Sequence, residues 1–233
     1  MPTVVITGAS QGIGRAIALS FSDLPDSRLA LLSRNEDRLE EVAALCADHG
    51  ADAVIMPCDV TDEEAVASVA RAILKEWGAP NVLVNNAGLF RPGMLADTSP
   101  AVFREQVEAN LTSAFLVTQS FLPAMIERRN GHIFFMASVA SIRAYAGGVA
   151  YCAAKHGLLG LSRVVREETK NSGIRVTAVM PGATFTPSWE GTELPEERFI
   201  SPDDVADTVM SAYQLSDRAV VEEVLVRPQL GDI

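Results

Sequence analysis

Short apolar, β-branched runs alternate along this chain with longer segments in which apolar residues recur at helical spacing. That alternation is typical of repeated strand–helix–strand units, in which helices cover both faces of a parallel sheet. We expect seven strands, at 3–7, 28–33, 52–57, 81–85, 132–137, 174–180 and 220–226. We expect six helices, at about 12–22, 35–48, 62–76, 100–128, 149–171 and 202–214. The pattern therefore predicts an α/β fold with a doubly wound sheet of about seven parallel strands.

Two of the expected helices carry clear start signals. A serine directly precedes a proline at the start of both 100–128 and 202–214, which places a capping hydroxyl before a residue suited to the first helical position. No repeat, low-complexity tract or linker interrupts the pattern, so we expect residues 1–233 to form a single domain. The longest irregular stretch, about 181–200, lies inside the pattern, which favours a functional loop over a linker.

Composition narrows the possible partners. The formal net charge of −11 argues against nucleic acid, because binding a phosphate backbone needs a basic face. The three cysteines have no C-x-x-C spacing and the three histidines no metal-ligand spacing, so we predict neither a disulfide framework nor a metal site. No apolar stretch approaches the ~20 residues that span a bilayer, and a strand-like run begins the chain without a basic leader. We expect a soluble, cytoplasmic protein that does not bind membranes.

The first strand runs into a glycine-rich loop, TGASQGIGRAIA, with Gly8, Gly12 and Gly14 at G-x-x-x-G-x-G spacing. Glycines there would let the backbone turn sharply and approach a pyrophosphate, whose charge the amide donors and the positive end of the following helix would meet. Glycines also occur in ordinary turns between strands and helices, so the loop alone does not establish a pyrophosphate site. Its place at the first crossover favours a dinucleotide site in a Rossmann-type fold.

The end of the second strand bears on the kind of nicotinamide cofactor. In a doubly wound fold this residue touches the adenosine ribose, where an acid accepts from the 2′-hydroxyl and an arginine accommodates a 2′-phosphate. Here the strand ends in Ser33 and Arg34, and a planar guanidinium suits a phosphate dianion. We predict NADPH rather than NADH. The competing interpretation is that Arg34 is only a solvated residue at a strand end. Glu36 and Asp37 are so close that either could instead be the residue that contacts the ribose.

A tyrosine, a lysine, a serine and an asparagine are the candidates for chemistry. Tyr151 and Lys155 are four residues apart, hence on one face of a helix, and a nearby cation would lower the tyrosine pKa from its usual value near 10. Ser138 follows the expected strand at 132–137, at the end where open α/β sheets bind ligands. Asn110 should disturb its helix locally. Taken singly, each residue has an ordinary alternative, namely an exposed helix face, a turn or a tolerated amide.

Together these motifs resemble the short-chain dehydrogenase/reductase family. They follow the family's order and separations over nearly the whole chain: TGASQGIG, CDV at 58–60, NNAG at 85–88, Asn110, Ser138, YCAAK at 151–155 and PGATFT at 181–186. The resemblance implies hydride transfer from the nicotinamide to a ketone or aldehyde carbon, with Tyr151 as general acid and Ser138 orienting the carbonyl oxygen. Lys155 would bind the nicotinamide ribose and tune Tyr151, and Asn110 would connect Lys155 to water.

The same resemblance implies a set of cofactor contacts. They are Gly8, Ser10, Gly12, Ile13, Gly14, Ser33, Arg34, Asp59, Val60, Asn86, Ala87, Gly88, Tyr151, Lys155, Pro181, Gly182, Thr184 and Thr186. One position departs from part of the family, since some members carry a basic residue just before the second glycine, where this chain has Gln11. Asp59 would accept from the adenine amino group, although an aspartate after a strand is often only a helix cap.

The segment after the sixth strand is expected to cover the substrate. Phe185 and Trp189 are the candidate substrate contacts, and with Leu194 and Phe199 they could form an apolar lid. The alternative is that these side chains only hold the loop to the core. With barely 20 residues before the next helix cap, the segment leaves no room for the added domain of nucleotide-sugar epimerases in the same superfamily. Reductases of small carbonyl compounds remain.

Within the family the chain looks most like bacterial sepiapterin-reductase-like members, through GHIFFMASVAS, PGATFTPSW and the ending VVEEVLVRPQLGDI. That resemblance suggests a pterin side-chain ketone as substrate. The rivals are a 3-oxoacyl-carrier-protein reductase, a general carbonyl or alcohol oxidoreductase and, from another class, a non-catalytic NADP-sensing regulator. The resemblance also implies a homodimer or homotetramer in which the helices that carry Asn110 and Tyr151 pack against their copies.

Overall fold

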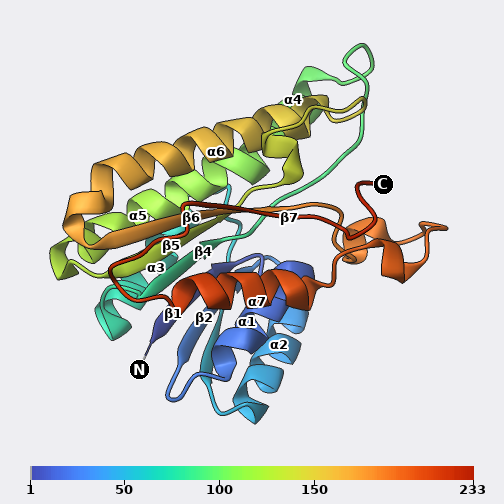
Figure 1. Ribbon diagram of the computed structural model, residues 1–233. Coiled ribbons are helices and arrows are strands. Elements are labelled where there is room, and N and C mark those ends of the chain that lie inside the picture. Colours follow the sequence, from blue (N-terminus) through green and yellow to red (C-terminus); the bar gives the residue numbers. More distant parts are fainter. Residues whose placement is uncertain (1) are drawn as a thin grey trace.

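The computed structural model describes residues 2–233, so the first residue of the expected 1–233 domain lies outside it. Seven strands form one sheet in the order β3-β2-β1-β4-β5-β6-β7 (Figure 1). Their bounds are β1 Thr3–Thr7, β2 Arg28–Ser33, β3 Asp52–Pro57, β4 Val82–Asn85, β5 Gly131–Met136, β6 Ile174–Pro181 and β7 Glu223–Val226. Every neighbouring pair is parallel. The predicted fold class is confirmed, and the last strand begins three residues later than expected.

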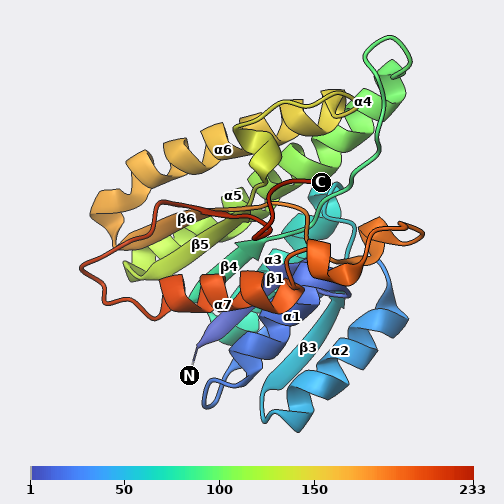
Figure 2. The same cartoon turned by 45° about the vertical axis from the view of Figure 1, so that its right-hand side comes forward.

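Helices cover both faces of this sheet. Their bounds are α1 Gly12–Ser22, α2 Glu36–Asp48, α3 Glu63–Trp77, α4 Pro100–Val107, α5 Ser113–Arg128, α6 Val149–Thr169 and α7 Pro202–Tyr213. α1, α2 and α7 lie on one face and α3, α5 and α6 on the other (Figures 1 and 2). Alternate residues of β1 point to opposite faces of the sheet. Val4 and Ile6 belong to the core under α1 and α7, and Val5 belongs to the core under α3 and α5. Burial on both faces explains the continuous apolar runs in the sequence.

Both helix start signals are confirmed. The Ser99 hydroxyl accepts a hydrogen bond from the backbone N–H of Val102 at the start of α4. Ser201 accepts from Asp203, and the Asp204 carboxylate accepts from the backbone N–H of Ser201, which completes a capping box before α7.

The expected single helix at 100–128 is wrong, because a π-helical turn, Glu108–Thr112, separates α4 from α5. Asn110 lies in this turn and is buried. Its amide Nδ2 donates both to the Gln106 carbonyl (2.8 Å) and to the Leu89 carbonyl (2.7 Å), outside the helix. The predicted local distortion at Asn110 is therefore confirmed, and it turns the amide toward the loop that follows β4.

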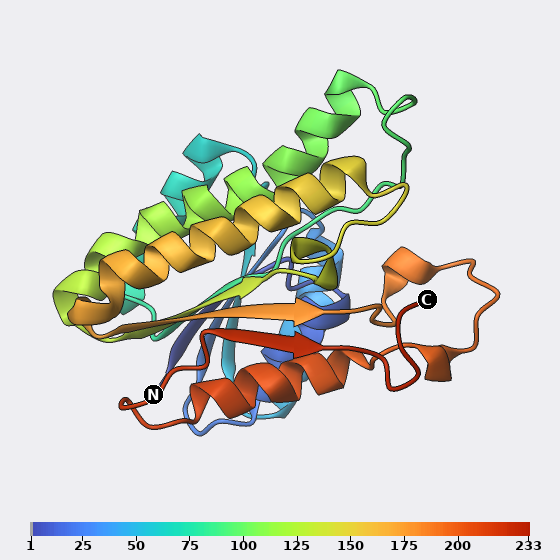
Figure 3. The same ribbon diagram turned by 45° about the horizontal axis from the view of Figure 1, so that its top comes forward.

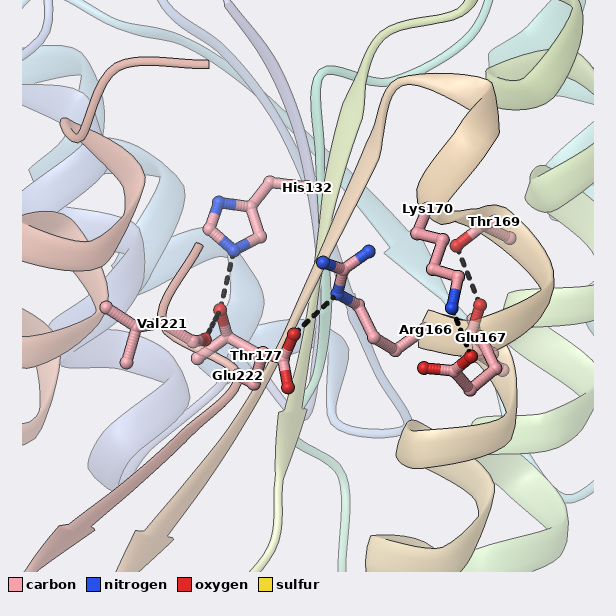
Figure 4. Close-up of polar contacts among 9 residues, drawn as sticks. His132, Arg166, Glu167, Thr169, Lys170, Thr177, Val221 and Glu222 are labelled. Carbon is pink, nitrogen blue, oxygen red and sulfur yellow. Dashed lines mark hydrogen bonds and ion pairs between the residues drawn. The ribbon is translucent and has the colours of Figure 1, made fainter. Parts of the chain in front are cut away.

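A buried polar chain ties the last three strands together (Figure 4). His132 Nε2 lies 2.7 Å from Thr177 Oγ1, and that hydroxyl donates to the Val221 carbonyl at 2.6 Å. On the outer surface, Arg166 of α6 pairs with Glu222 at 3.2 Å. These contacts fix the segment leading into β7 against the rest of the sheet.

The carboxyl ends of the strands all open on one edge of the molecule. Figure 3 shows β6 and β7 pointing toward the segment 182–200 and toward the C-terminal end of the chain. That segment contains two short 3-10 turns, Pro187–Trp189 and Glu196–Arg198, and two more follow β5 and α6, at Val139–Ser141 and Lys170–Ser172. The strand order reverses between β1 and β4, which is where open α/β sheets bind ligands. Within residues 2–233, no helix combines the length and apolar character that crossing a membrane requires.

Candidate active site

A cleft of about 1070 Å³ lies along this edge of the sheet. Its walls come from the glycine loop, the end of β2 and the loops that follow β3, β4, β5 and β6. Most of the predicted cofactor residues line it: Gly8, Ser10, Gly12, Ile13, Ser33, Arg34, Asp59, Val60, Asn86, Ala87, Gly88, Tyr151, Lys155, Pro181, Gly182, Thr184 and Thr186. Gly14 lies behind the loop rather than on the cleft wall. Residues scattered from 8 to 186 are thus brought to one cavity.

The glycine loop needs its glycines for two different reasons. Gly8 and Gly12 have φ angles of 65° and 54°, a region that residues with a side chain rarely adopt. At Gly14 a Cβ atom would lie 2.2 Å from the Gly8 carbonyl oxygen and 2.5 Å from the Asn86 amide. Asn86 Nδ2 in turn donates to the carbonyls of Thr7 and Gly8. The loop therefore packs directly on the start of α1, and its other side lines the cleft.

Beside the glycine loop, Ser33 donates a 2.9 Å hydrogen bond to Ser10 Oγ, which joins the end of β2 to this loop. The Arg34 guanidinium is 80% exposed and makes a loose 3.9 Å ion pair with Asp59. Asp59 does not cap α3, because Asp62 does. Instead Asp59 accepts from the backbone and hydroxyl of Thr61, and these bonds hold the pKa of its carboxyl below the usual value.

Ser138, Tyr151 and Lys155 meet at the bottom of the cleft. The Lys155 ammonium lies 5.6 Å from the centroid of the Tyr151 ring and donates a 2.7 Å hydrogen bond to the Met136 carbonyl. It is buried, and burial lowers its pKa to about 8. Asn110 and Lys155 both lie close to Gly88. A Cβ atom added at Gly88 would lie 2.7 Å from Asn110 Oδ1 and 3.7 Å from Lys155 Nζ. The four candidate catalytic residues are thus brought into one neighbourhood.

In the chain by itself the pKa of Tyr151 is raised, although Lys155 lies beside its ring. Burial raises the pKa of Tyr151, and the opposing influence is a hydrogen bond with Ser138 rather than the ammonium. The reason is that Lys155 faces the ring and points its Nζ to the Met136 carbonyl. A phenol whose pKa is raised remains protonated at neutral pH, which suits a proton donor.

Ser138 is held by the backbone around it. It caps the short turn Val139–Ser141, accepting from the backbone N–H of Ala140 at 3.1 Å. Its hydroxyl also lies 3.5 Å from the Pro181 carbonyl at the end of β6. The side chain is therefore fixed between the ends of β5 and β6, beside the Tyr151 hydroxyl.

The segment 182–200 fits the substrate prediction only in part. Trp189 lines the cleft, as expected of a substrate contact. Phe185 does not line the cleft, and its ring packs on Phe199 with centroids 5.5 Å apart. Phe199 is itself buried and also contacts Trp189 at 4.9 Å. Leu194 is exposed and lies off the cleft. Phe199 thus holds the loop to the core and leaves Trp189 as the aromatic side chain of this segment on the cleft.

Several cleft residues were missed by sequence reasoning. The Phe90 ring packs edge-on against Tyr151 with centroids 5.1 Å apart, and its place just after the NNAG motif could have indicated it. Tyr145 lines the same region. Asp232 reaches the cleft from the end of the chain, where it pairs with Arg143 at 3.1 Å and Arg227 at 2.7 Å. No local pattern signals that last contact, because only the path of the chain after β7 creates it.

Comparisons with known proteins agree with this geometry. The family model described as short chain dehydrogenase matches residues 2–197. A sepiapterin reductase of Chlorobaculum tepidum is 37% identical over 99% of this chain and 97% of its own. A putative ketoacyl reductase of the granaticin polyketide synthase from Streptomyces violaceoruber is 35% identical over 99% of this chain and 80% of its own. An alcohol dehydrogenase from the archaeon Thermococcus sibiricus, complexed with 5-hydroxy-NADP, superposes with a TM-score of 0.93 at 30% identity, covering 100% of this chain and 99% of that one.

Proposed function

This chain belongs to the short-chain dehydrogenase family, and from that membership we propose that it is an NADPH-dependent reductase of ketone or aldehyde groups in small molecules. The observation that carries the proposal is the meeting of Ser138, Tyr151 and Lys155 at the bottom of a cleft whose other end is the glycine loop. The cleft would therefore hold a proton donor at one end and the dinucleotide phosphates at the other.

The cleft fits the cofactor on steric grounds. Gly8 and Gly12 hold φ angles that residues with a side chain rarely adopt, and Gly14 lets the start of α1 approach the Gly8 carbonyl oxygen, which a Cβ atom would meet at 2.2 Å. The residues from Asn86 to Gly88 and from Pro181 to Thr186 would border the nicotinamide end. NADPH would supply the hydride. The residues of the chain would place the substrate carbon, orient the carbonyl oxygen and protonate that oxygen.

The proton would come from Tyr151. Ser138, whose hydroxyl opposes the rise in the pKa of this phenol, would hold the substrate oxygen beside it. Lys155 contacts the ring face and has a pKa of about 8, so its ammonium remains charged at neutral pH and would favour the phenolate as the proton leaves. Asn110, bonded to the Leu89 carbonyl beside Gly88, would connect Lys155 to water. In the reverse reaction Tyr151 would act as the base.

The preference for NADPH rests on the end of β2. Ser33 supplies no acid to repel a 2′-phosphate, and the guanidinium of Arg34 is 80% exposed on the cleft wall. The archaeal structure named above carries an NADP derivative, which supports the same choice. Asp59 would accept from the adenine amino group.

For the substrate we propose a small carbonyl compound, with a pterin side-chain ketone as the first candidate because a sepiapterin reductase is 37% identical. The ketoacyl reductase relative at 35% favours a 3-oxoacyl thioester as the second. A general carbonyl reductase is the remaining enzymatic alternative. A non-catalytic NADP sensor would not need the proton donor, whereas this chain keeps both Tyr151 and Lys155 in the cleft.

The test is NADPH oxidation across a panel of sepiapterin, diketones, acetoacetyl thioesters, sugars and simple aldehydes. Turnover of sepiapterin well above the other compounds would support the first substrate candidate, and turnover of the thioester alone would replace it by the second. Tight NADPH binding with no oxidation by any carbonyl would favour the sensor. Tight binding of NADH with none of NADPH would contradict the proposed cofactor.

We further propose that residues 1–233 act as one cytoplasmic domain that assembles as a homodimer or homotetramer. Exposed apolar side chains on the outer helices support assembly, among them Phe103 on α4, Phe115 on α5 and Val164 on α6. Sedimentation or sizing at micromolar concentration tests it, and a 24.9 kDa species alone would contradict it.

A further inference from the structure

The Gln11 side chain has a partner that its position in the sequence does not suggest. Gln11 directly precedes α1, yet its side chain makes no capping hydrogen bond to that helix. Its Oε1 atom instead accepts a hydrogen bond from Nη1 of Arg38, 27 residues away in α2. Gln11 itself lines the cleft. A guanidinium is therefore held at the glycine loop, although the loop has no basic residue before Gly12.

The backbone around Arg38 is fixed independently of this contact. Asn35 caps α2, and its side chain accepts a 2.9 Å hydrogen bond from the backbone N–H of Arg38. Arg38 lies in the first turn of α2, directly after the Ser33 and Arg34 segment that forms the adenosine end of the cleft. One short span of chain thus carries two exposed arginines: Arg34 lines the cleft, and Arg38 lies outside the lining but contacts Gln11, which lines it.

The positive charge of Arg34 at the adenosine end of the cleft is partly neutralised by a carboxylate. Arg34 already has Asp59 at 3.9 Å, and the hydrogen bonds from Thr61 keep that carboxyl ionised. Arg34 and Asp59 together carry almost no net charge, so alone they would attract a phosphate dianion weakly. A further guanidinium at the glycine loop adds a positive charge, although Glu36 and Asp37 lie between the two arginines in sequence. Two planar donors can engage different oxygens of one phosphate.

We propose that Arg38, held in place by Gln11, is a second phosphate-binding residue that selects NADPH over NADH. The inference rests on the proposed cofactor and adds to it a residue outside the glycine loop and outside the end of β2. Arg38 would contact the 2′-phosphate and nothing in the reacting part of the site. Gln11 would act only by positioning it.

The test compares the binding of NADP⁺ and NAD⁺ by isothermal titration calorimetry, without any carbonyl substrate. Arg38→Ala should raise the Kd for NADP⁺ about five- to tenfold and leave the Kd for NAD⁺ within about twofold, because only NADP⁺ carries the 2′-phosphate. The loss should shrink as salt is raised, since the contact is exposed. Arg71→Ala on α3, which removes an equal charge on the other face of the sheet, is the matched control and should change neither affinity.

Two further variants separate charge from structure. Gln11→Ala should weaken NADP⁺ binding in the same direction but less, because Arg38 remains. Gln11→Lys in the Arg38→Ala background should restore affinity for NADP⁺ by placing a cation on the loop itself. Failure of that restoration would show that the loss came from a disturbed α2 and would overturn the proposal.

The outcomes also separate this inference from the proposed function. An unchanged Kd for NADP⁺ in Arg38→Ala, or equal losses for NADP⁺ and NAD⁺, would overturn the role of Arg38 and leave the reductase proposal intact. A parent protein that binds neither nucleotide would overturn the proposed function and this inference with it.

Discussion

Lys155 Nζ donates a 2.7 Å hydrogen bond to the Met136 carbonyl and lies over the Tyr151 ring, 5.6 Å from the ring centroid. A buried ammonium with one backbone acceptor is costly to the folded state, and its pKa of about 8, against 10.5 in an unfolded chain, expresses that cost. The lysine is therefore placed for function at the expense of stability.

The first prediction concerns Lys155→Met, which keeps the length of the side chain and removes its charge. Since the folded state loses the proton at about pH 8 and the unfolded state only near 10.5, the unfolded state binds more protons in between, and stability rises with pH across that window. Between pH 7 and pH 10.5 the free energy of unfolding of the parent should therefore increase by on the order of 3 kcal/mol relative to that of the variant. Urea unfolding at both pH values measures this, and parallel stabilities at the two would contradict a buried ammonium.

The second prediction concerns proton transfer. Tyr151→Phe should lower turnover about 10²- to 10⁴-fold and leave NADP⁺ affinity unchanged, because only the hydroxyl is lost. An unchanged rate would remove Tyr151 from the mechanism. Thr98→Ala, outside the cleft, serves as the control with normal turnover.

The third prediction concerns the influence of Ser138 on Tyr151, which opposes the rise that burial causes in the tyrosine pKa. Reduction requires the protonated phenol, so its rate should be level near neutral pH and fall as pH rises through the pKa of Tyr151. In Ser138→Ala the rate should drop and the alkaline fall should move to higher pH. The pH profile of kcat/KM for reduction measures both, and a fall that moves to lower pH would contradict this influence of Ser138.

The fourth prediction contrasts two glycines. Gly14→Ala should weaken NADP⁺ binding at least about tenfold and lower the melting temperature, because its Cβ would lie 2.2 Å from the Gly8 carbonyl oxygen. Gly160→Ala should instead stabilise the protein by about 0.5–1 kcal/mol, since Gly160 lies inside α6 and nothing stands within 4 Å of its added Cβ. Calorimetric binding and thermal unfolding of both variants test the pair. Equal effects would mean that the loop packing is looser than described.

The fifth prediction concerns acid stability and His132, which is completely buried on β5 (Figure 4). Burial lowers its pKa to about 3 from 6.5, so the unfolded state binds the proton first and stability is lost as pH falls below 6.5. By pH 4.5 this loss should reach about 2–3 kcal/mol. In His132→Phe that part of the acid dependence should disappear, while Thr177 keeps its bond to the Val221 carbonyl. Unfolding curves at pH 7.5 and 4.5 measure it, and an equal decline in both proteins would contradict it.

Much of the fold could be predicted because its signals are local. Unbroken apolar runs mark strands buried on both faces, and six of the seven strands begin and end within one residue of their predicted bounds. The bounds of β1, β2 and β3 match exactly, and only β7 begins three residues later than predicted. The serine caps were likewise predictable, because each hydroxyl accepts from a backbone group within three positions. The distortion at Asn110 was predicted, but the break of the helix by a π-helical turn was not, and the amide also bonds to the Leu89 carbonyl 21 positions away.

What the sequence determined by itself was the set of elements, the glycine loop and the helical pairing of Tyr151 with Lys155, since backbone periodicity alone places residues four apart on one face. Tertiary structure decided the rest. It buried Tyr151 and so raised its pKa. It turned Phe185 onto Phe199, and it brought Arg38 to Gln11 across 27 positions. Such contacts join different elements, and their geometry and solvent exposure depend on how those elements pack rather than on spacing along the chain.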